Sequence, residues 1–74
     1  KNTHTIASCP SLERVLELIS EYISTPTAYL SIVEVQDFEY VTAYEITKCG
    51  IRLPNLMVRY LKEEKRWRIE GTLS

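Results

Sequence analysis

The clearest hydrophobic pattern lies in residues 11–24, SLERVLELISEYIS. Apolar side chains recur there at helical spacing, while charged side chains occupy the rest of the helix circumference. The apolar positions are Leu12, Val15, Leu16, Ile19 and Ile23. The pattern predicts an amphipathic helix that has Pro10 in its first turn, Ser8 or Cys9 at its cap and Thr25-Pro26 at its end.

Residues 27–47, TAYLSIVEVQDFEYVTAYEIT, allow two interpretations. The stretch is rich in β-branched and aromatic residues, and part of it alternates in polarity, which favours a β-hairpin. Against this, Thr42 and Glu45 match a helix capping box that Gly50 would close, and Gln36-Asp37 lacks the glycine of the best two-residue turns. We favour the hairpin.

Residues 51–67, IRLPNLMVRYLKEEKRW, also allow two interpretations. Leu53, Met57, Tyr60 and Leu61 form a stripe at helical spacing, and Pro54 suits a first turn, so the pattern predicts a second helix over about 54–65. The alternative pairs MVRYL with RWRIE as a hairpin. We rank it second because its turn would consist of Glu and Lys, which are poor turn residues.

Short β-compatible segments, HTIAS and WRIEGTL, flank these elements, so the expected order is β-α-β-β-α-β. This order is typical of an α+β, ferredoxin-like split βαβ plait, with two helices on one face of a four-stranded antiparallel sheet. We expect residues 1–74 to form one small domain of this kind. If residues 43–49 and 54–64 were instead two helices, the fold would be a winged helix-turn-helix.

Composition is that of an ordinary soluble globular domain, with 45% hydrophobic and 26% charged residues. No apolar run approaches the roughly 18 to 20 residues of a membrane-spanning helix, so we expect no membrane insertion. Because the first residue is Lys1 and not Met, we expect a processed product or a domain of a larger protein. Nothing in the sequence indicates a compartment.

Charge is distributed unevenly along the chain, although the net charge is only −1. Residues 1–47 hold two basic and seven acidic side chains, whereas residues 48–74 hold seven basic and three acidic ones. On the predicted second helix and beyond it the basic and polar residues form a stripe, which consists of Arg52, Asn55, Arg59, Lys62, Arg66 and Arg68. Such a stripe can neutralise phosphates, so nucleic-acid binding is an alternative function.

Candidate catalytic groups are few. The chain has one histidine and none of the common phosphate-loop, nucleophile-elbow or metalloprotease motifs, so we expect neither an enzyme nor a metal or cofactor site. We interpret His4 as a surface or packing residue. The carboxylates of Glu13, Glu17 and Glu21 lie four residues apart, which is typical of a solvated helix face.

The cysteines, Cys9 and Cys49, fit no zinc spacing. A thiol at a helix N-terminus can have a lowered pKa, but we expect Cys9 to be a packing residue. In the expected plait the two residues lie at opposite edges of the sheet, too far apart for a disulfide, so two free thiols are predicted.

Aromatic and β-branched side chains of the hairpin region exceed what one thin core can hide. A plait leaves one sheet face without helices, and aromatic residues are enriched where partners dock. The expected partner-binding residues of this face are Tyr29, Val33, Phe38, Tyr40 and Tyr44. The sequence therefore predicts a non-enzymatic protein-interaction, assembly or regulatory module that forms a homodimer through the sheet face or an edge strand, or binds another protein there.

Overall fold

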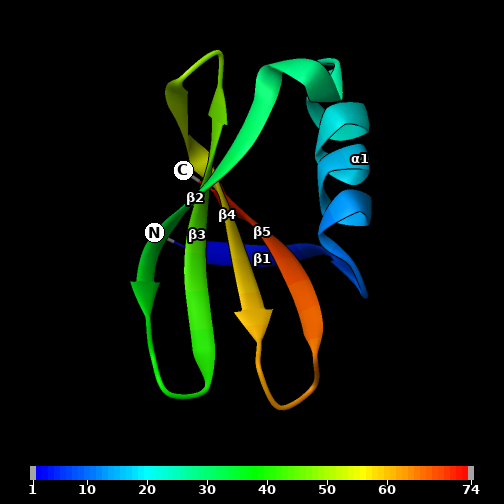
Figure 1. The fold of residues 1–74 in the computed structure, drawn as a ribbon. Coiled ribbons are helices and arrows are strands. Elements are labelled where there is room, and N and C mark those ends of the chain that lie inside the picture. The colour runs from blue at the N-terminus through cyan, green and yellow to red at the C-terminus, as the bar shows by residue number, and fades with distance from the viewer. Residues whose placement is uncertain (1, 74) are drawn as a thin grey trace.

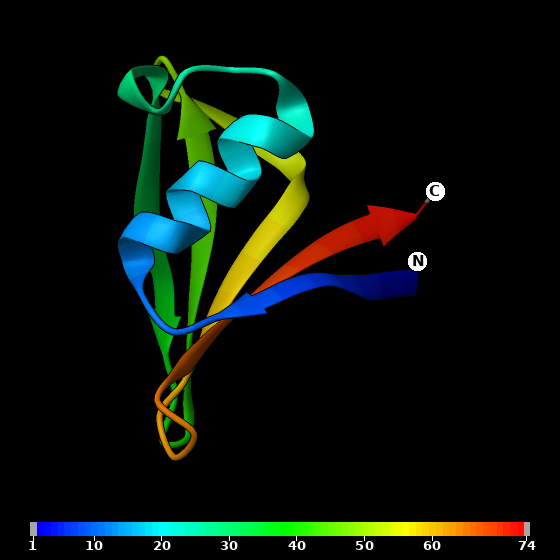
Figure 2. The same ribbon diagram turned by 90° about the vertical axis from the view of Figure 1, so that its right-hand side faces the viewer.

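The computed structural model describes residues 2–73, which form one antiparallel sheet with a single long helix on one face (Figures 1 and 2). The elements are β1 (Asn2–Cys9), α1 (Leu12–Ile23), a 3-10 turn η1 (Thr27–Tyr29), β2 (Leu30–Asp37), β3 (Val41–Lys48), β4 (Ile51–Leu61) and β5 (Arg66–Leu73). The five strands lie in the order β1-β5-β4-β3-β2, so β1 and β2 are the edge strands.

The first helix is confirmed. Ser11 caps α1, since its side-chain oxygen accepts a hydrogen bond of 3.3 Å from the backbone N–H of Arg14. Ser24 ends the helix in a left-handed conformation at φ 55°. Cys9 and Ser8 belong to β1 and do not cap the helix, and Pro10 precedes the cap residue, so it does not lie in the first helical turn as predicted.

The hairpin over residues 27–47 is also confirmed, because β2 and β3 pair antiparallel from Leu30–Lys48 to Asp37–Thr42. The sequence Cys49-Gly50 links β3 to β4, with φ values of 53° and 82°. Two successive positive φ values are those of a type I′ turn, whose twist matches that of the strands. Gly50 therefore closes a second hairpin and not a helix.

The ferredoxin-like plait is wrong, and so is the winged helix-turn-helix. Residues 51–61 form a strand that pairs with β3 and β5, and the hairpin of β4 with β5 replaces the expected second helix. Lys65 takes φ 55° in the turn, and its N–H donates to the carbonyl of Leu61 at 2.8 Å. A lysine thus occupies the left-handed position that glycine usually fills.

Pro54 fits within β4 because the strand bulges there. Glu45 faces Met57 and Thr47 faces Arg52, so two steps along β3 correspond to five steps along β4. Pairing of β4 with β5 starts only at Leu56. The missing N–H of Pro54 therefore costs no ladder hydrogen bond.

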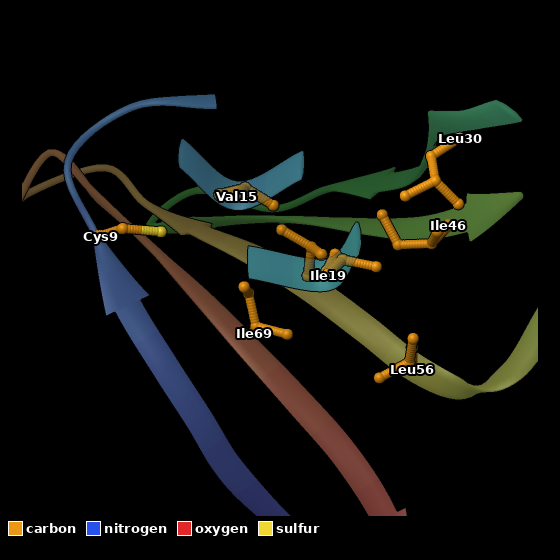
Figure 3. Close-up of a cluster of buried hydrophobic side chains, with 8 residues drawn as sticks. Cys9, Val15, Ile19, Leu30, Ile46, Leu56 and Ile69 are labelled. Carbon is orange, nitrogen blue, oxygen red and sulfur yellow. The ribbon is translucent and has the colours of Figure 1, made fainter. Parts of the chain in front are cut away.

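The hydrophobic core lies between α1 and the sheet face that it covers (Figure 3). Val15 and Ile19 supply the helix side, and Ile46, Val58 and Ile69 are the fully buried residues of the three central strands. Leu16 is only half-buried, so the core-facing stripe of the helix is narrower than expected. Burial of Cys9 in the same core raises the pKa of its thiol.

Both cysteines are free: Cys9 is buried, and Cys49 is exposed in the β3–β4 turn. The prediction of two free thiols assumed that β1 and β3 are neighbouring strands, and that strand order is wrong, since β5 and β4 separate β1 from β3.

Within residues 2–73, no helix has the length and apolar character needed to span a membrane.

Candidate functional site: the outer face of the sheet

The helix covers one face of the sheet, and no helix or loop of residues 2–73 covers the opposite face, which we call the outer face (Figure 1). Cross-strand register assigns residues to it. Val58 pairs with Tyr44 and Ile69 in the helix-side layer, so the adjacent pair Arg59 and Arg68 points to the outer face.

Arginines dominate the charge of the outer face. Arg59 on β4 lies directly opposite Arg68 on β5, and Arg66 lies two residues before Arg68 on the same side of β5. We call these three residues the arginine cluster. Like charges directly opposite each other in a sheet are destabilising, so this arrangement costs stability unless a counter-charge is present.

Glu70 supplies that counter-charge. Its Oε1 accepts a hydrogen bond of 2.9 Å from Nε of Arg59, and its Oε2 lies 3.8 Å from Nη1 of Arg68. Only 11% of the Glu70 side chain is exposed. Arg66 donates from Nε to the hydroxyl of Ser8 at 3.1 Å. Within residues 2–73, two guanidinium groups of the cluster therefore share one carboxylate, and the third bonds to a hydroxyl.

Arg52 adds a fourth positive charge further along β4. Its Nη1 lies 2.6 Å from Oε1 of Glu45, one of the outer-face residues of β3. The Arg52 side chain is 63% exposed, so this ion pair is a surface pair of small energy.

The expected basic stripe is thus divided by the structure. Arg52, Arg59, Arg66 and Arg68 share the outer face, but on two strands and not on a helix. Asn55 lies in the β4 bulge, away from them. Lys62 lies in the β4–β5 turn, where its Nζ is 2.6 Å from Oδ1 of Asp37 and donates to the carbonyl of Phe38.

Lys62 and Asp37 clasp the β2–β3 and β4–β5 turns, which lie side by side at one end of the sheet (Figure 1). Hydrogen bonds from Lys62 and Thr42 hold the pKa of the Asp37 carboxyl below its usual value. The backbone N–H of Lys62 also donates to the carbonyl of Tyr40 at 3.0 Å. This clasp has a structural role.

The expected aromatic patch does not form one surface. Tyr29 lies in η1, Phe38 and Tyr40 lie in the β2–β3 turn, and only Val33 lies on the outer face. Tyr44 belongs to the helix side. Its ring packs 5.4 Å from Trp67, which in turn packs 4.7 Å from Tyr60. Desolvation by this packing, with the charges of Glu34 and Asp37, raises the pKa of the Tyr44 hydroxyl.

Apolar side chains nevertheless occur on the outer face. The strand register places four half-buried apolar residues on this face, which are Val33, Val41, Met57 and Leu61. Ala43 lies buried between them at 7% exposure. The helix-side aromatic residues and the outer-face arginines are therefore separate features. Sequence reasoning named the arginines, but it missed Glu70 and the apolar residues, which only the strand register brings together.

Metal ligands and acidic clusters do not form a second site in the described residues. Among residues 2–73, no group of three His, Cys, Asp or Glu side chains is arranged to hold a metal ion. Glu13, Glu17 and Glu21 lie on α1, all exposed, and Glu17 pairs with Arg14 at 3.0 Å.

Comparison with known proteins gives no further assignment, since the chain matches no protein-family model, no curated protein and no solved structure.

Proposed function

We propose that this chain is a non-enzymatic interaction module that binds an acidic segment of a partner protein across the outer face of its sheet. The observation that carries the proposal is the arginine cluster of Arg59, Arg66 and Arg68, which has a single carboxylate within the fold. Arg59 and Arg68 share the one carboxylate of Glu70, and Arg66 bonds to the neutral hydroxyl of Ser8, so an acidic partner adds charge pairing that the fold itself does not provide.

The orientation of the guanidinium groups supports binding of carboxylates. Arg59 and Arg66 each use Nε to bond within the sheet, to Glu70 and Ser8. In residues 2–73, no side chain or carbonyl accepts a hydrogen bond from their terminal Nη groups. Guanidinium groups fixed in this way offer donors at little further entropic cost, and their planar geometry suits carboxylates.

Apolar neighbours define the rest of the partner. Met57 and Leu61 flank Arg59 on β4, and Val41 faces Leu61 from β3. A partner that presents both carboxylates and apolar side chains satisfies this mixed surface, as in ordinary protein interfaces. We therefore propose a segment in which acidic and apolar residues alternate.

Nucleic acid is the weaker alternative for the same arginines. Proteins that bind single strands stack the bases on aromatic side chains, whereas the described tyrosines, tryptophan and phenylalanine lie on the helix side, in η1 or in turns. The net charge of −1 and the outer-face residues Glu45 and Glu70 also disfavour a phosphate backbone.

A second copy of this chain is disfavoured on this face. A two-fold symmetric dimer through the outer faces would bring two arginine clusters together, which repel each other. Self-association through an edge strand, β1 or β2, stays a prediction.

The test uses a fluorescently labelled peptide of alternating glutamate and leucine, with binding followed by anisotropy. We expect the triple variant Arg59→Gln, Arg66→Gln, Arg68→Gln to bind about tenfold more weakly or worse, and affinity for the native chain to fall as salt is raised. The matched control is Arg14→Gln, which removes an arginine from α1 and should leave affinity unchanged.

Glu70→Gln separates binding from folding. Removing this carboxylate should lower stability, because Arg59 and Arg68 lose their shared counter-charge, and it should tighten peptide binding, because their donors are released. Equal binding by the triple variant and the native chain would overturn the proposal. Tighter binding of a labelled oligothymidylate than of the peptide would favour the nucleic-acid alternative instead.

A further inference from the structure

A cleft of about 440 Å³ opens on the helix side of the sheet, beside the end of α1. Its walls come from four strands and from the end of α1. The lining residues are His4 of β1, Tyr22 and Ile23 of α1, Thr25, Lys48 of β3, Leu53–Leu56 of β4, and Gly71 and Thr72 of β5. The volume lies in the range of about 300 to 1,000 Å³ that is typical of small-molecule sites.

The β4 bulge creates this cleft. Because Leu53, Pro54 and Asn55 lie outside the regular pairing of β4 with its neighbours, the strand departs from the sheet there and forms one wall. Leu56, where pairing with β5 resumes, is buried at 5% exposure and adds an apolar wall residue. The same bulge that accommodates Pro54 therefore makes room for a ligand.

Gly71 sets the position of His4 in the cleft. The two residues are cross-strand partners, and a Cβ at position 71 would lie 3.0 Å from Cε1 of His4 and 3.0 Å from Cδ1 of Ile6. The imidazole thus lies directly against the glycine backbone. A side chain at position 71 would push His4 from this place.

The ionisable groups that line the cleft are His4, Tyr22 and Lys48, and no carboxylate is among the lining residues. In the described part of the chain, no Asp or Glu forms an ion pair with Lys48. The cleft therefore combines an uncompensated ammonium group with imidazole, phenol and amide donors over an apolar wall. This combination suits a ligand that has one negative charge and an apolar body.

We infer that the cleft binds a small carboxylic acid with an apolar body of about one ring in size, with its carboxylate at Lys48 and its body against Leu53, Pro54 and Leu56. This site is independent of the proposed function, because it lies on the helix side and shares no residue with the outer-face arginines. Both activities can therefore be tested in the same chain.

The experiment titrates the ¹⁵N-labelled chain with benzoate and records amide and side-chain chemical shifts. We expect saturable shifts at Lys48, Leu56 and Gly71, with a Kd on the order of 1 mM or tighter. Benzamide has the same shape without the charge and should bind about tenfold more weakly. Shifts of equal size and midpoint with both compounds would overturn recognition of the carboxylate.

Variants locate the charge. Lys48→Gln should weaken benzoate binding about tenfold and leave benzamide binding unchanged, whereas Lys48→Arg should retain most of the affinity. The matched control is Lys65→Gln, an exposed lysine in the β4–β5 turn that does not line the cleft. Unchanged benzoate affinity in Lys48→Gln, or no saturable shift in the native chain, would overturn the inference.

Discussion

Ile19 gives the sharpest test of how α1 packs on the sheet. Its side chain is 1% exposed and lies between Ile46, Leu56 and Ile69, at the centre of the buried cluster (Figure 3). Replacing it by alanine removes three carbon groups from the only long helix among the described residues. The rest of the core is rigid enough that we expect a cavity to remain.

The magnitude follows from the removed groups. Three carbon groups at about 0.8 kcal/mol each give about 2.4 kcal/mol of lost transfer free energy, and the cavity adds about 1 kcal/mol. The higher helix propensity of alanine returns about 0.4 kcal/mol. We therefore expect Ile19→Ala to lower the free energy of unfolding by about 3 kcal/mol, and Ile19→Val to lower it by about 1 kcal/mol.

Urea unfolding followed by circular dichroism measures both changes. For 74 residues a total stability of about 4 to 11 kcal/mol is expected, so Ile19→Val provides a folded variant if the alanine variant unfolds. The matched control is Glu21→Ala, an exposed position of the same helix, which should change stability by less than about 0.5 kcal/mol. A loss below about 1 kcal/mol for Ile19→Ala would refute the packing of α1 against β3, β4 and β5.

Cys9, Gly50 and Asp37 each provide a further measurable outcome. One thiol per native chain should react with a thiol reagent, since Cys49 is exposed while burial hides Cys9 and raises its pKa; two rapidly reacting native thiols would contradict the core. Gly50→Ala should lower the free energy of unfolding by about 1 kcal/mol because φ is 82° there, and an unchanged urea midpoint would argue against the type I′ turn. Because the pKa of the Asp37 carboxyl is lowered from 3.8 in the folded state, its stabilising contribution is present above the unfolded pKa of 3.8 and is lost as pH falls through the folded pKa. Asp37→Asn should lack this acid-dependent component when urea unfolding is measured at several pH values. An identical pH profile in the variant and the native chain would count against the clasp with Lys62.

Local signals were sufficient to predict the first half of the fold. Helix α1 has an apolar stripe and a proline beyond its end, all within a few residues, although its cap is Ser11 and not the predicted Ser8 or Cys9. The β2–β3 hairpin has β-branched and aromatic residues at the required density. For these elements, short-range preferences and tertiary packing agree.

Long-range pairing decided the second half, and the sequence pattern misled there. Strand β4 has apolar residues on both faces, with Leu56 and Val58 toward α1 and Met57 and Leu61 toward the outer face, so helical spacing was satisfied by coincidence. Pairing with β3 and β5 on both sides outweighs that local preference. The β4–β5 turn lacks glycine, and it gains contacts from the distant Asp37 and Phe38 through Lys62.

The candidate sites were predictable only as residue types. The arginines of the basic stripe were identified from charge alone, but their grouping around Glu70 depends on the register between β4 and β5. The cleft had no signal in the sequence, because its lining residues come from segments as distant as His4 and Thr72. Spacing along the chain carries no information about such contacts until the strand order is known.

The most direct test of the proposed function maps the binding face by NMR. Titration of the ¹⁵N-labelled chain with the peptide of alternating glutamate and leucine should shift the amide and guanidinium signals of Arg59, Arg66 and Arg68, together with the amides of Met57 and Leu61. The signals of α1 should stay in place. Shifts concentrated on α1 or in the cleft, with the arginine signals unmoved, would contradict the account.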